Sequence, residues 1–336
     1  MTAPQTSPRI ADRPTGTPMK KYLTFLFACW VLLSSGSAWP ADNKLNIVFI
    51  PKSSDQMFWD LMRNGVERAM QEEGQIDLTW RGPAYNDDTD SQIRILQYYT
   101  RAGVDAIVIT PTDRSRLVGP VEQAVRMGIK VVVVDSALDG SGHLQFVTTD
   151  NHASGQLAAR QLAELMGQRG RVVLLRTVAG SASTDDRARG FIDYLSANAP
   201  AISIVADVYG GGSAGKARHS ASALLAKSAD FDAIFAVNES ATDGMLRALR
   251  EAGLAGRKRF IGFDSTPFLL EGLEKKEIDG LIVQDPDRMG YLAIKAVVAA
   301  LRNRPIKESV IHTGTTLVTR ANFRRPEIKK LMCVRC

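Results

Sequence analysis

The chain has 336 residues, 42 of them Lys or Arg and 36 Asp or Glu, which gives a formal net charge of +6. Charges of both signs are interleaved along the sequence, so it has no basic stripe of the kind that binds nucleic acid. The length exceeds the about 250–300 residues that a single hydrophobic core usually serves, and predicts two domains. The four histidines are dispersed and lack the spacing of a zinc-binding helix, so we expect neither a metal site nor a cofactor.

The N-terminal segment has the pattern of an export signal. Lys20 and Lys21 precede an apolar run over residues 22–33, and small residues follow up to Ala38. The apolar run is too short to span a bilayer. We therefore expect residues 19–38 to be a cleaved signal peptide and the mature protein to lie outside the cytoplasm. Residues 1–18 form an atypical leader, which leaves Met1 and Met19 open as start sites.

Short β-branched runs then alternate with amphipathic helical stretches up to about Val318. Nine runs are expected to be strands: residues 45–50, 78–81, 106–110, 131–134, 172–176, 202–208, 233–237, 260–263 and 281–284. Their continuous apolar character is typical of strands covered on both faces, and the helical stretches are long enough for right-handed crossovers. The pattern predicts an α/β fold with doubly wound parallel sheets.

An extended segment over residues 145–151 divides this pattern and ends in a helix N-cap at Asp150 or Asn151. We therefore expect two sheets of about five strands instead of one of nine. The predicted boundaries are 44–149 plus 285–313 for the N-terminal lobe, 150–284 plus 314–325 for the C-terminal lobe, and 326–336 for a tail. Two such lobes joined by several crossing strands make a hinge.

Polar residues follow nearly every predicted strand, at the carboxyl ends where such sheets bind ligands. The candidates, with the aromatic residues beside them, are Phe58, Trp59, Asp135, Asp185, Asn238, Phe263, Asp264 and Gln284. Carboxylates and amides hydrogen-bond vicinal hydroxyls, and aromatic faces cover the C–H side of a sugar ring. Helix capping explains any one of the polar residues, but the whole set favours a cleft that binds a polyol.

On these residues the chain resembles the periplasmic sugar-binding proteins of the ribose-binding type, which share their fold with the ligand domains of the lactose-repressor class. The resemblance covers about residues 45–319. Its motifs are Phe58 and Trp59 with Gly65, residues 110–113 (Thr-Pro-Thr-Asp), Asp150 with Asn151, residues 235–238, and residues 262–267 (Gly-Phe-Asp-Ser-Thr-Pro). It implies a two-lobed receptor that closes over a small ligand and presents it to a membrane permease or, in some members, to a chemoreceptor. We expect a periplasmic monomer that delivers a sugar to an ABC permease; the alternative is a ligand sensor that presents the sugar to a chemoreceptor or sensor kinase.

The resemblance also implies roles for single residues. Phe58 and Trp59 match ring-stacking aromatics, Asp135 a hydroxyl-binding aspartate, and Phe263 a pocket aromatic. Asn238, Asp264 and Gln284 match amide and carboxylate ligands of the second lobe and hinge.

Two positions depart from the ribose type, because Ser136 and Asp185 stand where that type has arginines. A carboxylate cannot replace an arginine donor without changing the ligand. We therefore expect a more acidic pocket and a ligand other than ribose: another polyol, an amino sugar, or a ligand with a positive group. Arg187 is expected to neutralise Asp185 or Asp186.

Two further motifs resemble ion or nucleotide sites. Residues 210–217 (Gly-Gly-Gly-Ser-Ala-Gly-Lys-Ala) fit a phosphate loop but end in Ala217, where a hydroxyl must bind magnesium. Residues 86–90 (Asn-Asp-Asp-Thr-Asp) lack the glycine and distal glutamate of a calcium loop. We expect a plain strand-to-helix loop and an acidic turn, the latter with Thr89 or Asp90 capping the next helix.

No catalytic apparatus is visible. The chain has no hydrolase elbow, and Asp135 and Asp264 are expected to bind a ligand and not to catalyse glycoside cleavage. Cys333 and Cys336 form a C-x-x-C at the end of the chain. A redox site needs such a pair in a folded pocket, so a stray pair in the tail is expected, and whether the two cysteines form a disulfide stays open. The sequence therefore favours a binding protein over an enzyme.

Overall fold

The computed structural model describes residues 44–227 and 230–332. The predicted signal peptide, both candidate start sites, Cys333 and Cys336 lie outside these residues. None of the helices in the described part of the chain is long and apolar enough to cross a membrane.

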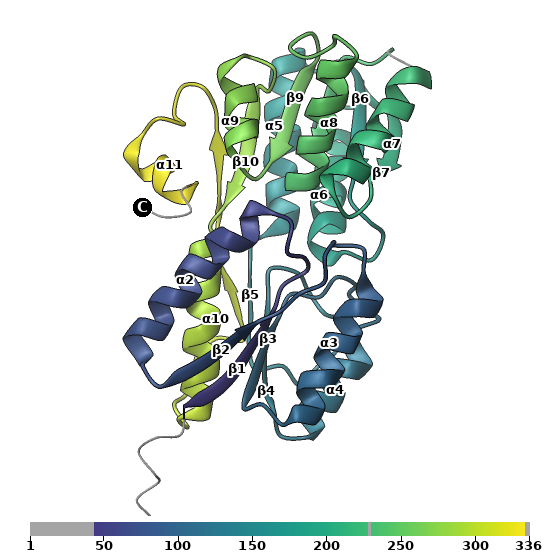
Figure 1. Ribbon diagram of the computed structural model, residues 1–336. Helices are drawn as coiled ribbons and strands as arrows, with labels where there is room; N and C mark the ends of the chain where they lie inside the picture. The colour runs from purple at the N-terminus through teal and green to yellow at the C-terminus, as the bar shows by residue number, and fades with distance from the viewer. Residues whose placement is uncertain (1–43, 228–229, 333–336) are drawn as a thin grey trace, which may run out of the picture. The chain divides into compact units, whose positions relative to one another are not determined.

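The described residues form two six-stranded sheets (Figure 1). The N-terminal sheet has the order β11–β5–β4–β3–β1–β2 and is parallel throughout. Its strands are β1 (Leu45–Ile50), β2 (Ile76–Trp80), β3 (Ala106–Ile109), β4 (Lys130–Val134), β5 (Phe146–Thr148) and β11 (Val310–His312).

The C-terminal sheet has the order β12–β10–β9–β8–β6–β7, and only β12 runs antiparallel to its neighbour. Its strands are β6 (Gly170–Arg176), β7 (Ile202–Tyr209), β8 (Ala233–Ala236), β9 (Arg259–Phe263), β10 (Gly280–Gln284) and β12 (Thr315–Val318). The predicted α/β fold with two doubly wound lobes is confirmed. Three strands were not among the nine predicted ones: β5 and β11 of the N-terminal sheet and β12 of the C-terminal sheet. They are three or four residues long and leave no continuous apolar run in the sequence.

Helices cover both faces of each sheet. The N-terminal lobe contains α2 (Met57–Glu73), α3 (Thr89–Ala102), α4 (Val118–Arg126) and α10 (Pro286–Leu301), and the C-terminal lobe contains α5 (Asn151–Met166), α6 (Ala182–Asn198), α7 (Ala214–Lys227), α8 (Glu239–Glu251), α9 (Pro267–Glu274) and α11 (Pro326–Leu331). Along β1, Ile47 and Phe49 pack in the cluster of α2 and α10, while Val48 and Ile50 pack in that of α3 and α4. Burial on both faces therefore explains why this strand has no polar alternation.

The close approach of α2 and α10 depends on Gly65. A Cβ at this position would overlap the backbone oxygen of Asp287. Any larger residue would push the two helices apart and open the core between them and the sheet. This contact sets how closely α2, the helix that carries Phe58 and Trp59, packs against α10.

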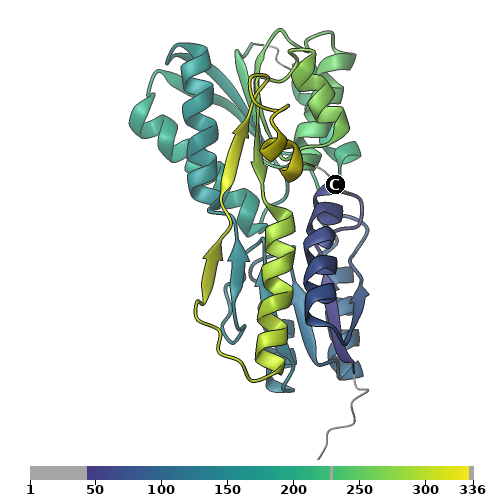
Figure 2. The same cartoon turned by 90° about the vertical axis from the view of Figure 1, so that its left-hand side faces the viewer.

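The chain crosses between the lobes three times, after β5, after β10 and between β11 and β12. Figure 2 shows the last crossing, where β11 and β12 follow each other along one side of the molecule. The crossings are bonded to one another, since Thr149 Oγ1 donates to Gln284 Oε1 at 2.9 Å and Thr313 N donates to Thr148 O at 2.8 Å. These three short segments form the hinge.

The predicted turns are present with one correction. Asp150 caps α5 by accepting from Ala153 N at 2.9 Å, and residues 210–213 link β7 to α7. The acidic turn precedes α3, but its N-cap is Asp88, which accepts from Ser91 N at 3.0 Å. The expectation of Thr89 or Asp90 as the cap was wrong, because both already lie in the first helical turn, where a side chain no longer reaches the orphan amides.

The segment predicted as a tail is packed in its described part. Helix α11 places Ile328 in the apolar cluster of α8 and α9, and Met332 joins the same cluster. These contacts extend the core of the C-terminal lobe.

Candidate ligand-binding site

The carboxyl ends of the two sheets enclose a cavity of about 20 Å³. Residues of both lobes line it: Lys52, Gln56, Phe58, Trp59, Asn86 and Asp135 from the N-terminal lobe, and Thr177, Ser181, Ser183, Thr184, Arg187, Asn238, Asp264 and Gln284 from the C-terminal lobe and hinge. Six of these were predicted from the sequence. The volume holds about one water-sized sphere, so the lobes are closed on each other.

The first turn of α2 brings the two predicted aromatic residues to this cavity. The Phe58 and Trp59 rings meet edge to face, with centroids 4.9 Å apart at 87°. Trp59 Nε1 donates to Ser53 Oγ at 2.9 Å, which fixes the indole. Both rings are about 95% buried and offer an apolar wall next to the polar residues.

Lys52, which the sequence analysis did not single out, reaches across the cleft from the end of β1. Its Nζ donates to Ser181 Oγ at 2.9 Å and to Ser183 Oγ at 3.0 Å, and lies 3.9 Å from Asp135 Oδ2. Burial lowers the pKa of Lys52 to about 8, against the opposing effect of Asp135. Its place two residues after a buried strand was a usable signal, but a lysine is not one of the carboxylates and amides that were expected to bind a polyol.

Asp135 and Asp264 occupy matching places at the ends of β4 and β9. Both are buried, and both have a left-handed backbone with φ of 64°, a conformation that costs about 1–3 kcal/mol in a residue other than glycine. Burial raises the pKa of both carboxyl groups, while Arg187 acts in the opposite direction on each. Such local strain at two facing carboxylates is expected at a functional site.

The C-terminal half of the cavity is a connected hydrogen-bond network. Gln284 Nε2 donates to Asp264 Oδ1 at 2.7 Å, and Glu239 N donates to Asp264 Oδ2 at 2.9 Å. Asn238 Oδ1 accepts from Thr177 Oγ1 at 2.9 Å and from Ala241 N at 3.1 Å. Asn238 is thus both a helix cap and a cavity residue. At this position, helix capping and a place in the ligand site do not exclude each other.

Arg187 is fully enclosed and does not pair with Asp185 or Asp186 as expected. Its Nε donates to Asn151 Oδ1 at 2.8 Å, its NH1 donates to Val237 O at 3.0 Å, and its guanidinium carbon lies 3.8 Å from the Phe263 ring centroid. Residues one and two positions apart on a helix do not face each other. The neutralisation predicted for Arg187 was therefore wrong, and Phe263 supports the cavity from beneath this guanidinium.

Asp185, like Phe263, is a predicted site residue that does not line the cavity. Its carboxylate accepts from Gly180 N at 3.1 Å and lies 3.9 Å from Arg176. The lining residues carry two cations, Lys52 and Arg187, and two carboxylates, Asp135 and Asp264. The excess of acidic groups expected in the pocket is absent from the lining residues, because Lys52 supplies a cation that Ser136 and Asp185 do not.

Glu239, also missed in the sequence, joins the two lobes beside the cavity. Its Oε1 accepts from Met57 N at 3.0 Å and its Oε2 from Phe58 N at 2.9 Å. Burial raises the pKa of Glu239 to about 8, and the charge of Asp264 adds to the rise. A carboxyl group at the start of α8 therefore caps the first turn of α2 in the other lobe.

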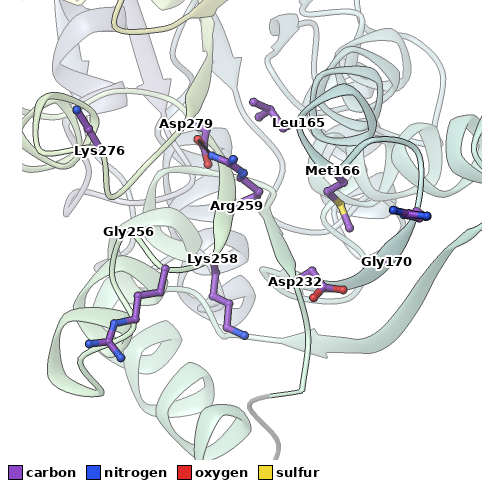
Figure 3. Close-up of a pocket in the computed structure, with 11 residues that line it drawn as sticks. Leu165, Met166, Gly170, Asp232, Gly256, Lys258, Arg259, Lys276 and Asp279 are labelled. Carbon is purple, nitrogen blue, oxygen red and sulfur yellow. Dashed lines mark hydrogen bonds and ion pairs between the residues drawn. The ribbon is translucent and has the colours of Figure 1, made fainter.

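A larger hollow of about 700 Å³ lies elsewhere, at the amino ends of the C-terminal strands. Figure 3 shows Gly170 and Arg259, the first residues of β6 and β9, with Asp232 and Asp279 among its walls. Open α/β sheets bind ligands outside the carboxyl ends of their strands. The hollow is at the opposite end, so the smaller cavity between the lobes is the candidate site.

Comparison with known proteins agrees with this placement. Residues 47–305 match the family described as periplasmic binding protein domain. The D-ribose/D-allose-binding protein of Pseudomonas aeruginosa is 28% identical over 291 residues, which cover 82% of this chain and 89% of that protein.

Two solved structures are also similar. An ABC transporter solute-binding protein of Agrobacterium vitis with bound D-fucose has a TM-score of 0.83 and 31% identity, covering 86% of this chain and 100% of that one. A carbohydrate transporter solute-binding protein of Agrobacterium radiobacter in complex with D-arabinose has a TM-score of 0.82 and 31% identity, covering 86% and 99%. The family match spans most of the chain and includes both lobes with the cavity between them, so the chain belongs to the periplasmic binding protein family.

Proposed function

We propose that this protein captures one monosaccharide or related polyol between its lobes in the periplasm and delivers it to an ABC permease. The observation that carries the proposal is the shared cavity, in which both lobes supply polar ligating groups and α2 supplies two aromatic rings. The similar proteins with bound D-fucose and D-arabinose support the same ligand class. The protein acts as a monomer, and presentation to a chemoreceptor or sensor kinase has no separate support in the structure.

The closed state gains its stability from contacts made across the cleft. Lys52 bonds to Ser181 and Ser183 of the opposite lobe, and Ser183 N donates to Ser136 Oγ at 3.2 Å. A ligand shifts the equilibrium towards closure only if it interacts more favourably with the closed lobes than with the open ones. A sugar whose hydroxyls bond to Asp135 from one lobe and Asp264 from the other meets this condition.

Lys52 is the side chain that has to move when a sugar enters the cavity. Its flexible side chain spans the cleft to Ser181 and Ser183, and its ammonium group has three donors. When a sugar enters, Nζ turns from the two serine hydroxyls to hydroxyls of the ligand. A balanced set of two cations and two carboxylates fits a neutral polyol better than an amino sugar, and the absence of arginine at Ser136 and Asp185 disfavours ribose.

A thermal-shift screen tests this function. D-Fucose, D-arabinose, D-allose, D-ribose, glucosamine and sorbitol are added to the mature protein and to Asp264→Ala. A neutral sugar at 100 times its Kd should stabilise the wild type by about 2.7 kcal/mol, with a smaller effect of ribose and none on Asp264→Ala. Asp186→Asn, a partly exposed residue paired with Arg189, is the control and should respond like the wild type. If no polyol raises Tm, or if Asp264→Ala responds fully, the proposal is wrong.

A further inference from the structure

The two motifs that resemble a calcium loop and a phosphate loop meet each other across the cleft. The acidic turn, residues 86–90, runs from the loop after β2 into the first turn of α3 in the N-terminal lobe. The glycine-rich loop, residues 210–216, runs from the end of β7 into the first turn of α7 in the C-terminal lobe. Asn86 N donates to Gly212 O at 3.2 Å, and Gly212 N donates to Asp87 Oδ2 at 3.2 Å. Lys216 Nζ donates to the same carboxylate oxygen at 2.6 Å.

This contact requires a glycine at position 212. A Cβ on Gly212 would overlap the backbone nitrogen of Asp87 and lie 2.6 Å from Asp87 Cγ. The obstacle consists of residues of the opposite lobe, so it exists only while the lobes are closed. A Cβ on Gly215, three residues further along, would meet no other atom within 4 Å among the described residues. The loop therefore carries one glycine that closure needs and one that it does not.

The turn also delivers a side chain to the ligand cavity. Asn86 lines the cavity and is 5% exposed, yet its Oδ1 has no hydrogen-bond partner among the described residues. Gln56 Nε2, also a lining group and 8% exposed, is likewise without a partner in this part of the chain. A buried acceptor and a buried donor left unpaired cost about 1–3 kcal/mol each. A ligand hydroxyl is able to donate to Asn86 Oδ1 and to accept from Gln56 Nε2.

From these contacts we infer that the acidic turn and the glycine-rich loop form a latch between the lobes, and that the latch positions Asn86 to bind a hydroxyl of the ligand. The backbone of Asn86 is held by Gly212 while its side chain faces the cavity, so closure and ligand recognition share one residue. The part concerning the ligand rests on the proposed function; the latch itself does not.

Four variants test this inference: Gly212→Ala, its matched control Gly215→Ala, Lys216→Ala and Asn86→Ala. Affinity is measured by calorimetry with whichever of D-fucose, D-arabinose and D-allose gives the largest thermal shift. The radius of gyration is measured by small-angle X-ray scattering with and without that sugar. Gly212→Ala should weaken binding at least tenfold and enlarge the sugar-saturated protein, whereas Gly215→Ala should match the wild type.

The other two variants separate the latch from recognition. Lys216→Ala should weaken binding about threefold, since the pair is partly exposed, and the loss should shrink at high salt. Asn86→Ala should bind the sugar about tenfold more weakly, because one hydrogen bond to the buried ligand is no longer made. The radius of gyration of the sugar-saturated protein should not change.

The possible outcomes test the latch, the role of Asn86 and the proposed function separately. Equal affinity and equal radius for Gly212→Ala and Gly215→Ala would overturn the latch, and full affinity in Asn86→Ala would overturn its role in recognition. If no sugar binds the wild type but Gly212→Ala alone enlarges the ligand-free protein, the latch stands and the proposed function fails. If the wild type binds no sugar and the radii agree, both fail.

Discussion

The two aspartates of the cleft have the same backbone and different surroundings. Asp264 of the C-terminal lobe accepts hydrogen bonds from Gln284 Nε2 and Glu239 N. The nearest cation to the Asp135 carboxylate is Lys52 Nζ, 3.9 Å away, which bonds instead to serines of the opposite lobe. One half of the site is therefore preformed by a hydrogen-bond network, and the other half adjusts through a flexible lysine. A preformed half lowers the cost of ordering on binding, and an adjustable half admits the ligand.

The largest expected difference between the halves concerns sugar affinity. Asp264→Ala should weaken binding at least 100-fold, because it removes one ligating group and releases a second, Gln284, each worth about 1.5–3 kcal/mol when charge-assisted. Asp135→Ala should weaken binding about tenfold, since Lys52 remains to bond the ligand. Calorimetry measures both, and an equal loss would remove the distinction between a preformed and an adjustable half.

Lys52→Met should change both the pH dependence of stability and the affinity for sugar. It removes a buried ammonium whose pKa burial lowers to about 8. Below about pH 8 the folded state bears the cost of the charge, and stability rises as the pH increases from about 8 towards the ordinary value of 10.5. The variant should lose that rise and bind sugar about tenfold more weakly, because the bonds to Ser181 and Ser183 are lost. Urea unfolding across this pH range measures the first effect and calorimetry the second, and a rise that persists in the variant would contradict the assignment.

Glu239→Gln probes the preformed half in the opposite pH direction. The pKa of Glu239 rises from 4.5 to about 8 through burial, so its contribution to stability is present below about pH 4.5 and is lost as the pH rises to about 8. Subtracting the unfolding curve of the variant from that of the wild type should isolate this decline. A flat difference between pH 5 and 8 would show that the carboxyl group does not titrate there.

Ser136→Ala should have the smallest effect. It removes the acceptor of the Ser183 N–H, a single bond between the lobes worth about 0.5–1.5 kcal/mol. Sugar affinity should fall about threefold, and Ser136→Thr, which keeps the hydroxyl, should restore it. A tenfold loss would indicate that Ser136 itself bonds the ligand.

The sequence predicted the fold well because the buried strands of both sheets are continuous apolar runs, as in β4 and β8. It missed β11, whose three residues are exposed or half-buried and carry no such signal. It predicted six lining residues because strand ends converge at one edge of each sheet.

The remaining site residues depend on tertiary packing. Lys52 enters the cavity only because Ser181 and Ser183 of the other lobe meet it there, and no local pattern encodes that encounter. The partners of Arg187 were misjudged because adjacency in sequence was taken for adjacency on the helix surface. Two separate motifs supply Asn86, Asp87 and Gly212, and they contact each other only when the lobes are closed.

A crystal structure of the complex with the sugar that gives the largest thermal shift tests the central claim most directly. We predict one sugar ring against Trp59, with hydroxyls bonded to Asp135 and Asp264 and with Lys52 Nζ turned from Ser181 and Ser183 to the ligand. A sugar bound instead in the hollow beside Arg259 and Asp232, or a cavity with Lys52 still on the two serines, would contradict the account.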